Sequence, residues 1–315
     1  MDLKENKAKI VFMGTPEFAV PSLDILVKNG FNVACVVTVP DKPQGRGLKL
    51  SQSEVKKYAL EHNLPILQPE KLKDEKFIKY LEELSPDIIV VVAFRILPRE
   101  VYSLAKLGAF NLHASLLPKY RGAAPINWAI INGETKTGVT TFFLDDKVDT
   151  GNIIFQEEVD INSDETAGDL HDKLMQIGAN LVLKTVHAIL NNNAPRIQQS
   201  DLKATPAPKI FKEHCKIDWN NQMEKIHNLI RGLSPYPAAF TTYKGKIIKI
   251  YKSEKTNTKV DLLPGSVLVI KEDLFVACND SYLKIIELQL EGKKRLKTEE
   301  FLRGFNFQKE DTLGS

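Results

Sequence analysis

The feature that most constrains the fold is residues 88–93, an unbroken run of apolar and mostly β-branched side chains. Such a run is typical of a central strand in a parallel sheet, where helices cover both faces. Helix-like stretches separate it from similar short runs at 9–13, 31–39, 65–67 and 109–113. The alternation predicts an α/β, Rossmann-like, doubly wound and mostly parallel sheet. Thr15 is expected to cap the first helix.

The last third of the chain has a different pattern. A polar, proline-containing stretch at 193–209 predicts a linker between a catalytic domain at 1–192 and a C-terminal domain at 210–315. Short alternating runs after residue 240 predict a small β-barrel of the OB-like kind. Net charge is only +3 for the whole chain, but the C-terminal domain has 18 basic and 14 acidic side chains. The basic surplus is therefore concentrated in that domain.

Cysteine content and hydropathy exclude several classes of protein. The three cysteines, at 35, 215 and 278, are far apart, which fits neither a disulfide framework nor a metal site. The N-terminus resembles neither a signal peptide nor a membrane span. We therefore expect a cytoplasmic protein that needs no metal and contacts no membrane.

Two residue types suited to acyl transfer to an amine lie on the predicted strand at 109–113. Asn111 and His113 are two residues apart, so their side chains project from one face of a strand. An amide can donate to an oxygen that gains negative charge, and an imidazole can move a proton near neutral pH. A carboxylate can orient the imidazole, but spacing alone does not choose among Asp145, Asp146 and Asp149. Because an isolated Asn-x-His pair is usually structural, the interpretation depends on its surroundings.

Basic residues in three places allow two interpretations each. The loop at 38–49 has two prolines, two glycines and three cations, which suits a clamp on a phosphate backbone or a solvated surface loop. A lysine row from 244 to 259 could be a cationic track for RNA or a solvated strand face. Arg121 could contact a polyanion or a surface carboxylate.

A resemblance to a known family joins these segments. Residues 111–126 and the later Asp149-Thr-Gly151 resemble the signature of the 10-formyltetrahydrofolate-dependent formyltransferases. Segments 12–21, 40–47, 290–296 and 300–304 are similar to members that formylate initiator tRNA. The resemblance implies transfer of a formyl group from 10-formyltetrahydrofolate to the amino group of methionyl initiator tRNA, for translation initiation. It also implies that the C-terminal domain binds the tRNA.

The resemblance further implies roles for individual residues. The implied catalytic residues are Asn111, His113 and Asp149, which selects one of the three aspartates. The implied folate-binding residues are Ser115, Leu116, Leu117, Pro118, Phe94, Arg95, Ile96 and Leu97. The tRNA-binding residues are expected to be Arg46, Lys42, Lys49, Lys244, Lys246 and Lys249. The chain departs from many relatives at Phe94-Arg95, where they have Tyr-Gly, and at Tyr236, where they have Trp.

Two other functions compete with this one. The same core could formylate a small amine, such as glycinamide ribonucleotide or an amino-sugar nucleotide, or hydrolyse formyl-folate. The chain could also be a non-catalytic RNA-binding module. The basic C-terminal domain and the Arg46 loop argue against the first, and the intact Asn111, His113 and Asp149 set argues against the second. We expect the protein to act as a monomer.

Overall fold

The chain forms two compact units. The computed structural model describes residues 7–44, 49–308 and 310–314. The first unit contains residues up to 122, 138–159 and 171–206, and the second contains 123–137, 160–170 and 207 onward. Two segments from the middle of the sequence therefore belong with the C-terminal residues.

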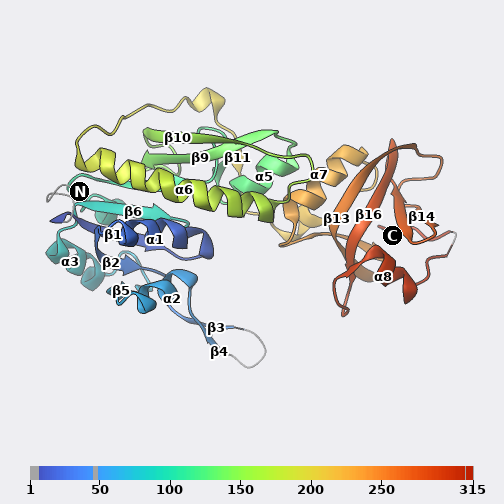
Figure 1. Ribbon diagram of the computed structural model, residues 1–315, viewed down its shortest axis with the longest axis horizontal. Helices are drawn as coiled ribbons and strands as arrows, with labels where there is room; N and C mark the ends of the chain where they lie inside the picture. Colours follow the sequence, from blue (N-terminus) through green and yellow to red (C-terminus); the bar gives the residue numbers. More distant parts are fainter. Residues whose placement is uncertain (1–6, 45–48, 309, 315) are drawn as a thin grey trace. The chain divides into compact units, whose positions relative to one another are not determined.

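A seven-stranded sheet forms the centre of the first unit, in the order β10-β9-β7-β6-β1-β2-β5 (Figure 1). Its strands are β1 (Lys9–Gly14), β2 (Asn32–Val37), β5 (Ile66–Leu67), β6 (Ile88–Val92), β7 (Gly108–His113), β9 (Lys136–Phe143) and β10 (Ile153–Asp160). Neighbours from β5 to β7 pair in parallel, whereas β7 and β9 pair antiparallel. The predicted α/β, mostly parallel sheet is confirmed.

Helices cover both faces of this sheet, which explains why every residue of β6 is buried. On one face, Val91 and its neighbours pack against α3 (Glu75–Leu84) and α4 (Arg99–Tyr102). On the other, α6 (Ala167–Leu190) runs alongside the strands (Figure 1), and Thr185 Oγ lies 2.8 Å from Thr141 Oγ of β9. An aromatic contact between Phe31 and His187, with centroids 5.2 Å apart, joins the connection between α1 (Val20–Lys28) and β2 to α6.

Side chains cap the N-termini of two helices, whereas the cap predicted for a third helix is absent. Ser53 caps α2 (Glu54–Glu61), and Asp74 caps α3, each by accepting backbone N–H groups. The prediction that Thr15 caps α1 is wrong. Pro16 occupies the capping position of a preceding 3-10 turn, η2 (Glu17–Ala19), and the buried Thr15 hydroxyl has no hydrogen-bond partner in the described structure.

The strand order of the first unit locates a crevice. From β1 the chain moves outward through β2 to β5, then returns to the other side of β1 with β6 and β7. In such sheets, ligands bind at the carboxyl ends of strands where the order reverses. Gly14 ends β1 and Phe94 follows β6 at this edge, and Asn111 and His113 lie at the same end of β7.

The second unit is built on an antiparallel sheet in the order β12-β13-β16-β15-β14, with β17 paired to β16. Its strands are β12 (Ala239–Tyr243), β13 (Lys246–Lys259), β14 (Val267–Ile270), β15 (Asp273–Ala277), β16 (Ser281–Leu290) and β17 (Leu296–Lys297). Its helices are α5 (Pro125–Ile131), α7 (Met223–Leu233) and α8 (Thr298–Arg303). Trp219, Ile230 and Ile250 are buried in its core. The predicted small β-rich C-terminal domain is confirmed.

Short elements complete the described chain. They are β3 (Lys42–Gln44), β4 (Lys49–Ser51), β8 (Arg121–Gly122), β11 (Pro206–Ala207), and the 3-10 turns η3 (Asp201–Lys203) and η4 (Lys212–Cys215). Strands β3 and β4 pair antiparallel. No helix in the described residues is both long and apolar enough to span a bilayer.

Candidate active site

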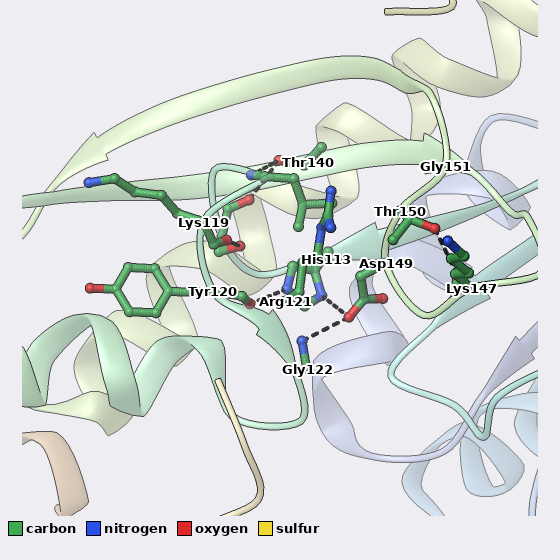
Figure 2. A network of polar contacts seen from close by, with 12 residues as sticks. His113, Lys119, Tyr120, Arg121, Gly122, Thr140, Lys147, Asp149, Thr150 and Gly151 are labelled. Carbon is green, nitrogen blue, oxygen red and sulfur yellow. Dashed lines mark hydrogen bonds and ion pairs between the residues drawn. The ribbon is translucent and has the colours of Figure 1, made fainter. Parts of the chain in front are cut away.

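His113 and Asp149 face each other at the carboxyl end of β7 (Figure 2). His113 Nδ1 lies 3.9 Å from Asp149 Oδ2, and both side chains are largely buried. The distance is too long for a hydrogen bond but allows an ion pair once the imidazole is protonated. The same Oδ2 accepts a 2.9 Å hydrogen bond from the backbone N–H of Gly122. The two side chains are therefore adjacent but are not hydrogen-bonded to each other.

The orientation of His113 is set by a backbone carbonyl. His113 Nε2 lies 2.8 Å from the Tyr120 carbonyl oxygen. A carbonyl oxygen only accepts hydrogen bonds, so Nε2 must carry the hydrogen. Nδ1 is then the ring atom that can gain or lose a proton, and it is the one that faces Asp149. Tyr120 itself has a left-handed backbone, with φ of 61°.

The structure separates the three aspartates that spacing could not. Asp145 accepts hydrogen bonds from Thr150 Oγ and from the N–H of Lys147, so it shapes the turn. Asp146 accepts a 2.6 Å hydrogen bond from the Tyr102 hydroxyl. Asp149 is the aspartate that faces the imidazole, as the resemblance implies.

The loop that carries Asp149 is fixed by its backbone. Asp149 has a left-handed conformation, with φ of 57°, which aspartate adopts more readily than most L residues. Two residues later, Gly151 passes so close to β9 that a Cβ would lie 1.7 Å from the Phe143 carbonyl oxygen. A side chain at 151 would therefore displace the loop.

Gln199 holds this loop from a segment that the sequence predicted to be a linker. Its amide nitrogen donates to the carbonyl oxygens of Asp149, at 3.0 Å, and Gly151, at 2.8 Å. Its amide oxygen accepts two hydrogen bonds from the Arg121 guanidinium. Arg121 also forms a 2.8 Å ion pair with Asp201, a carboxylate partner of the kind that was one of its two predicted alternatives. Sequence reasoning missed Gln199, because a glutamine in a polar stretch carries no signal of its own.

Asn111 lies at a cavity of about 110 Å³ beside the strand ends. Its side chain is half-buried and has no hydrogen-bond partner among the described residues, so the amide can serve a ligand. The cavity is lined by Val91, Phe94, Arg95, Ile96, Leu97, Tyr102, Asn111, Leu144 and the segment 145–149. Four predicted folate-binding residues, 94–97, thus share this cavity with Asn111 and Asp149.

The segment Ser115 to Pro118 is not among the residues that line the cavity. The Ser115 hydroxyl donates to the Lys119 carbonyl oxygen, and Thr140 Oγ donates to the Ser115 carbonyl oxygen. The Leu117 side chain is buried against Phe142. These contacts set the shape of the loop, and a direct contact with folate stays a prediction.

Arg95, where many relatives have glycine, connects the cavity rim to a neighbouring segment. Its guanidinium donates to the carbonyl oxygens of Pro69, at 2.8 Å, and Glu70, at 2.9 Å. Burial lowers the pKa of Arg95, and its Nε has no partner among the described residues. The guanidinium is therefore largely committed to the protein backbone.

The predicted tRNA-binding residues differ in their exposure and in their contacts with other residues of the chain. Lys244 forms a 2.9 Å ion pair with Asp311, Lys246 is exposed, and half-buried Lys249 donates to the Pro237 carbonyl oxygen at 3.4 Å. Lys42 is exposed on β3. Arg46 and the side chain of Lys49 lie outside the described residues. Among those residues, no cluster of three or more His, Cys, Asp or Glu is arranged to hold a metal.

Comparison with known proteins agrees with this geometry. Residues 8–186 match the family model described as formyl transferase, and residues 209–306 match the formyl transferase C-terminal domain. The chain belongs to the formyl transferase family. The family predicted from the sequence is thereby confirmed, and this formyl transferase has both of the family's domains.

Relatives of this formyl transferase match it over nearly their whole length. A methionyl-tRNA formyltransferase of Bacteroides fragilis is 52% identical over 314 residues, covering 96% of this chain and 97% of the relative. One of Flavobacterium johnsoniae is 50% identical over 310 residues, covering 97% of this chain and 98% of the relative. The similarity thus includes the C-terminal domain.

Solved structures share the fold of this formyl transferase. An N-formyltransferase from Helicobacter canadensis, in complex with folinic acid and dTDP-3-aminofucose, superposes with a TM-score of 0.67 at 24% identity. The match covers 92% of this chain and 100% of that one. HypX from Aquifex aeolicus, in complex with tetrahydrofolic acid, gives a TM-score of 0.62 at 16% identity, over 96% of this chain and 50% of HypX.

Proposed function

We propose that this formyl transferase moves a formyl group from 10-formyltetrahydrofolate to the amino group of methionyl initiator tRNA. The observation that carries the proposal is the 52% identity to a methionyl-tRNA formyltransferase across both domains. A C-terminal domain with a surplus of basic residues supports a polyanionic substrate. We further infer that the enzyme acts as a monomer in the cytoplasm, where translation begins.

The chemistry joins the amine nitrogen to the formyl carbon and breaks the bond from that carbon to N10 of the folate. Negative charge develops on the formyl oxygen during attack. We assign the donor to that oxygen to the amide of Asn111, which lines the cavity, and such donors contribute about 3–4 kcal/mol where they have been removed. The products are a formylated aminoacyl-tRNA and tetrahydrofolate.

Proton movement falls to His113 and Asp149. The attacking amine must lose a proton and N10 must gain one. Since Nε2 of His113 is occupied by the Tyr120 carbonyl, Nδ1 is the atom that exchanges the proton. The Asp149 carboxylate, 3.9 Å away, stabilises the imidazolium that forms.

The cavity beside Asn111 suits a flat heteroaromatic ring with polar edges. Phe94, Leu97 and Leu144 supply apolar walls. The loop at 145–149 supplies backbone groups and carboxylates that can accept hydrogen bonds from ring N–H groups. These features fit the pterin of 10-formyltetrahydrofolate, which we place there as a co-substrate.

A direct assay tests the proposal. The purified protein is incubated with 10-formyltetrahydrofolate and one acceptor in each reaction. The acceptors are methionyl initiator tRNA, free methionine and an amino-sugar nucleotide, and formyl incorporation into each is measured. We expect formylation of the charged tRNA alone. Formylation of a small amine instead would overturn the tRNA substrate but keep the chemistry. Absence of formylation in every arm would leave a binding module.

A further inference from the structure

The peptide group between Tyr120 and Arg121 has a hydrogen-bond partner at each end. Its carbonyl oxygen lies 2.8 Å from His113 Nε2 and accepts from it (Figure 2). Its N–H group, which belongs to Arg121, donates to the Thr205 carbonyl oxygen at 2.9 Å. The peptide is trans and planar, so its C=O and N–H bonds point in opposite directions. Thr205 on one side and His113 on the other therefore set the orientation of one rigid group.

The side chain of Thr205 also holds the preceding peptide. Its Oγ accepts a 2.9 Å hydrogen bond from the Tyr120 N–H group. Tyr120 is buried, so this N–H needs a partner within the protein, and its left-handed backbone is uncommon for a residue other than glycine. Pro206 follows Thr205, and a residue before proline is restricted to an extended backbone. Thr205 thus holds both peptide groups that flank Tyr120.

Segment 199–205 is the common source of restraint on both members of the proposed catalytic pair. Near its start, the Gln199 amide donates to the loop that carries Asp149. At its end, Thr205 holds the peptide that faces His113. The imidazole and the carboxylate are therefore positioned by residues only six apart in the sequence.

We propose that Thr205 is a positioning residue for His113. It keeps the Tyr120 carbonyl oxygen directed at Nε2, and this keeps Nδ1 directed at the Asp149 carboxylate. If the carbonyl could turn, the imidazole could rotate or carry its hydrogen on Nδ1, and either change would remove Nδ1 from the position where it exchanges a proton. The role in turnover rests on the proposed function, whereas the effect on the imidazole can be measured without a substrate.

Two substitutions separate the hydroxyl of Thr205 from the shape of its side chain. Thr205→Val keeps the β-branched shape and removes the acceptor, and Thr205→Ser keeps the hydroxyl. Thr205 is exposed, so neither change leaves a cavity in the core. In Thr205→Val, exchange of the Tyr120 amide hydrogen with D₂O should accelerate about two- to tenfold, because that amide loses its partner. In Thr205→Ser the exchange rate should stay near the native one.

The decisive measurement is made on His113. In the native chain, NMR spectra of the neutral imidazole should show hydrogen on Nε2 alone, and in Thr205→Val a form with hydrogen on Nδ1 should become detectable. The kcat for formylation should fall about tenfold in Thr205→Val, while the KM for folate changes by less than about twofold. Thr205→Ser should restore both the native tautomer and kcat. A residue that only stabilises the fold would not produce this change in tautomer.

Thr258→Val is the matched control, because Thr258 is an exposed threonine of β13 that undergoes the same chemical change. It should leave the exchange rate, the tautomer and kcat at their native values. A native tautomer and native kcat in Thr205→Val would overturn the inference. Equal losses of kcat in Thr205→Val and Thr205→Ser would overturn it too, since the hydroxyl would then not be the group that acts.

Formylation of methionyl initiator tRNA by the native enzyme is measured in parallel, so that the two proposals can fail separately. If Thr205→Val changes the tautomer of His113 but the native enzyme does not formylate the tRNA, the proposed function fails alone. If the native enzyme formylates the tRNA and Thr205→Val leaves the tautomer and kcat unchanged, the positioning role of Thr205 fails alone.

Discussion

The Nε2 atom of His113 donates to the Tyr120 carbonyl oxygen at 2.8 Å, and this contact fixes which nitrogen of the ring can work as acid or base. Nδ1 is left to face Asp149 Oδ2 at 3.9 Å. A histidine held by a carbonyl in this way cannot exchange roles between its two nitrogens without breaking the contact. Proton transfer is thereby confined to one side of the ring.

The tautomer of His113 can be observed. We expect long-range proton–nitrogen NMR spectra of the neutral imidazole to show hydrogen on Nε2 and none on Nδ1, because a carbonyl accepts only from a protonated nitrogen. Comparison with the His113→Gln variant assigns the signal. A neutral ring with hydrogen on Nδ1 would contradict the proposed direction of proton transfer.

Replacement of Asn111 should affect turnover rather than folate binding. Asn111→Ala removes the amide donor, so kcat should fall by about a hundred- to a thousandfold while folate affinity changes little. Asn111→Asp is the matched variant of similar shape that has acceptors in place of the donor. Steady-state kinetics and equilibrium binding of folate distinguish the two effects. A raised KM with unchanged kcat would show that Asn111 only binds.

Gln199 should act on catalysis through the Asp149 loop. Gln199→Leu removes two hydrogen bonds to that loop and both contacts to Arg121, so kcat should fall about tenfold or more with a smaller change in KM. Exposed Gln198 provides the control, since Gln198→Leu changes the same residue type one position away. Equal activity of the two variants would show that the loop keeps its position without Gln199.

Gly151 should tolerate no side chain. A Cβ at 151 would overlap the Phe143 carbonyl oxygen, so Gly151→Ala must move the Asp149 loop. We expect a large loss of formylation activity and a lower Tm. Gly304→Ala is the control, because a Cβ there meets no atom within 4 Å. Thermal unfolding and activity of the two variants give the comparison, and normal activity in Gly151→Ala would contradict the packing.

Asp311 should make the second unit sensitive to acid. Burial alone would raise the pKa of this carboxyl, but hydrogen bonds from Tyr243 and Lys244 outweigh it and lower the pKa to about 2. Because the folded pKa lies below the unfolded value of about 3.9, the stabilisation is present above pH 4 and lost as pH falls toward 2. Asp311→Asn should lower the free energy of unfolding by about 2 kcal/mol at pH 7 and flatten its dependence on pH in that window.

Urea unfolding followed by Trp219 fluorescence measures this effect, since Trp219 is buried in the same unit. The control is Asp273→Asn, which removes a partly exposed ion pair with Lys284 and should change stability by less than about 1 kcal/mol. Equal effects of the two substitutions on the free energy of unfolding would contradict the larger contribution expected of Asp311.

Apolar periodicity was enough to predict the sheet of the first unit. The run that became β6 is buried at every position, and the strand that carries His113 ends at that residue, where the sequence predicted. Such runs are strong signals because a central strand has no polar face. The capping rule failed at Thr15, because Pro16 and a 3-10 turn lie between Thr15 and α1.

The polar part of the site was less predictable. Asn111 and His113 were found because they share a strand face, and the resemblance selected Asp149. The hydrogen bonds of Gln199 join positions 48 and 50 residues apart, and no local pattern encodes a pairing of that kind. Lys244 looked like a free cation in the sequence, but its partner Asp311 is 67 residues away.

The left-handed backbone at Asp149 restricts how this position can vary over evolutionary time. Glutamate would preserve the carboxylate, yet its longer side chain tolerates positive φ less well than aspartate does. Glycine would suit the backbone but lose the charge, and asparagine would keep the shape and lose the charge as well. Chemistry and conformation thus each permit a different small set of amino acids here, and aspartate is the residue that the two sets share.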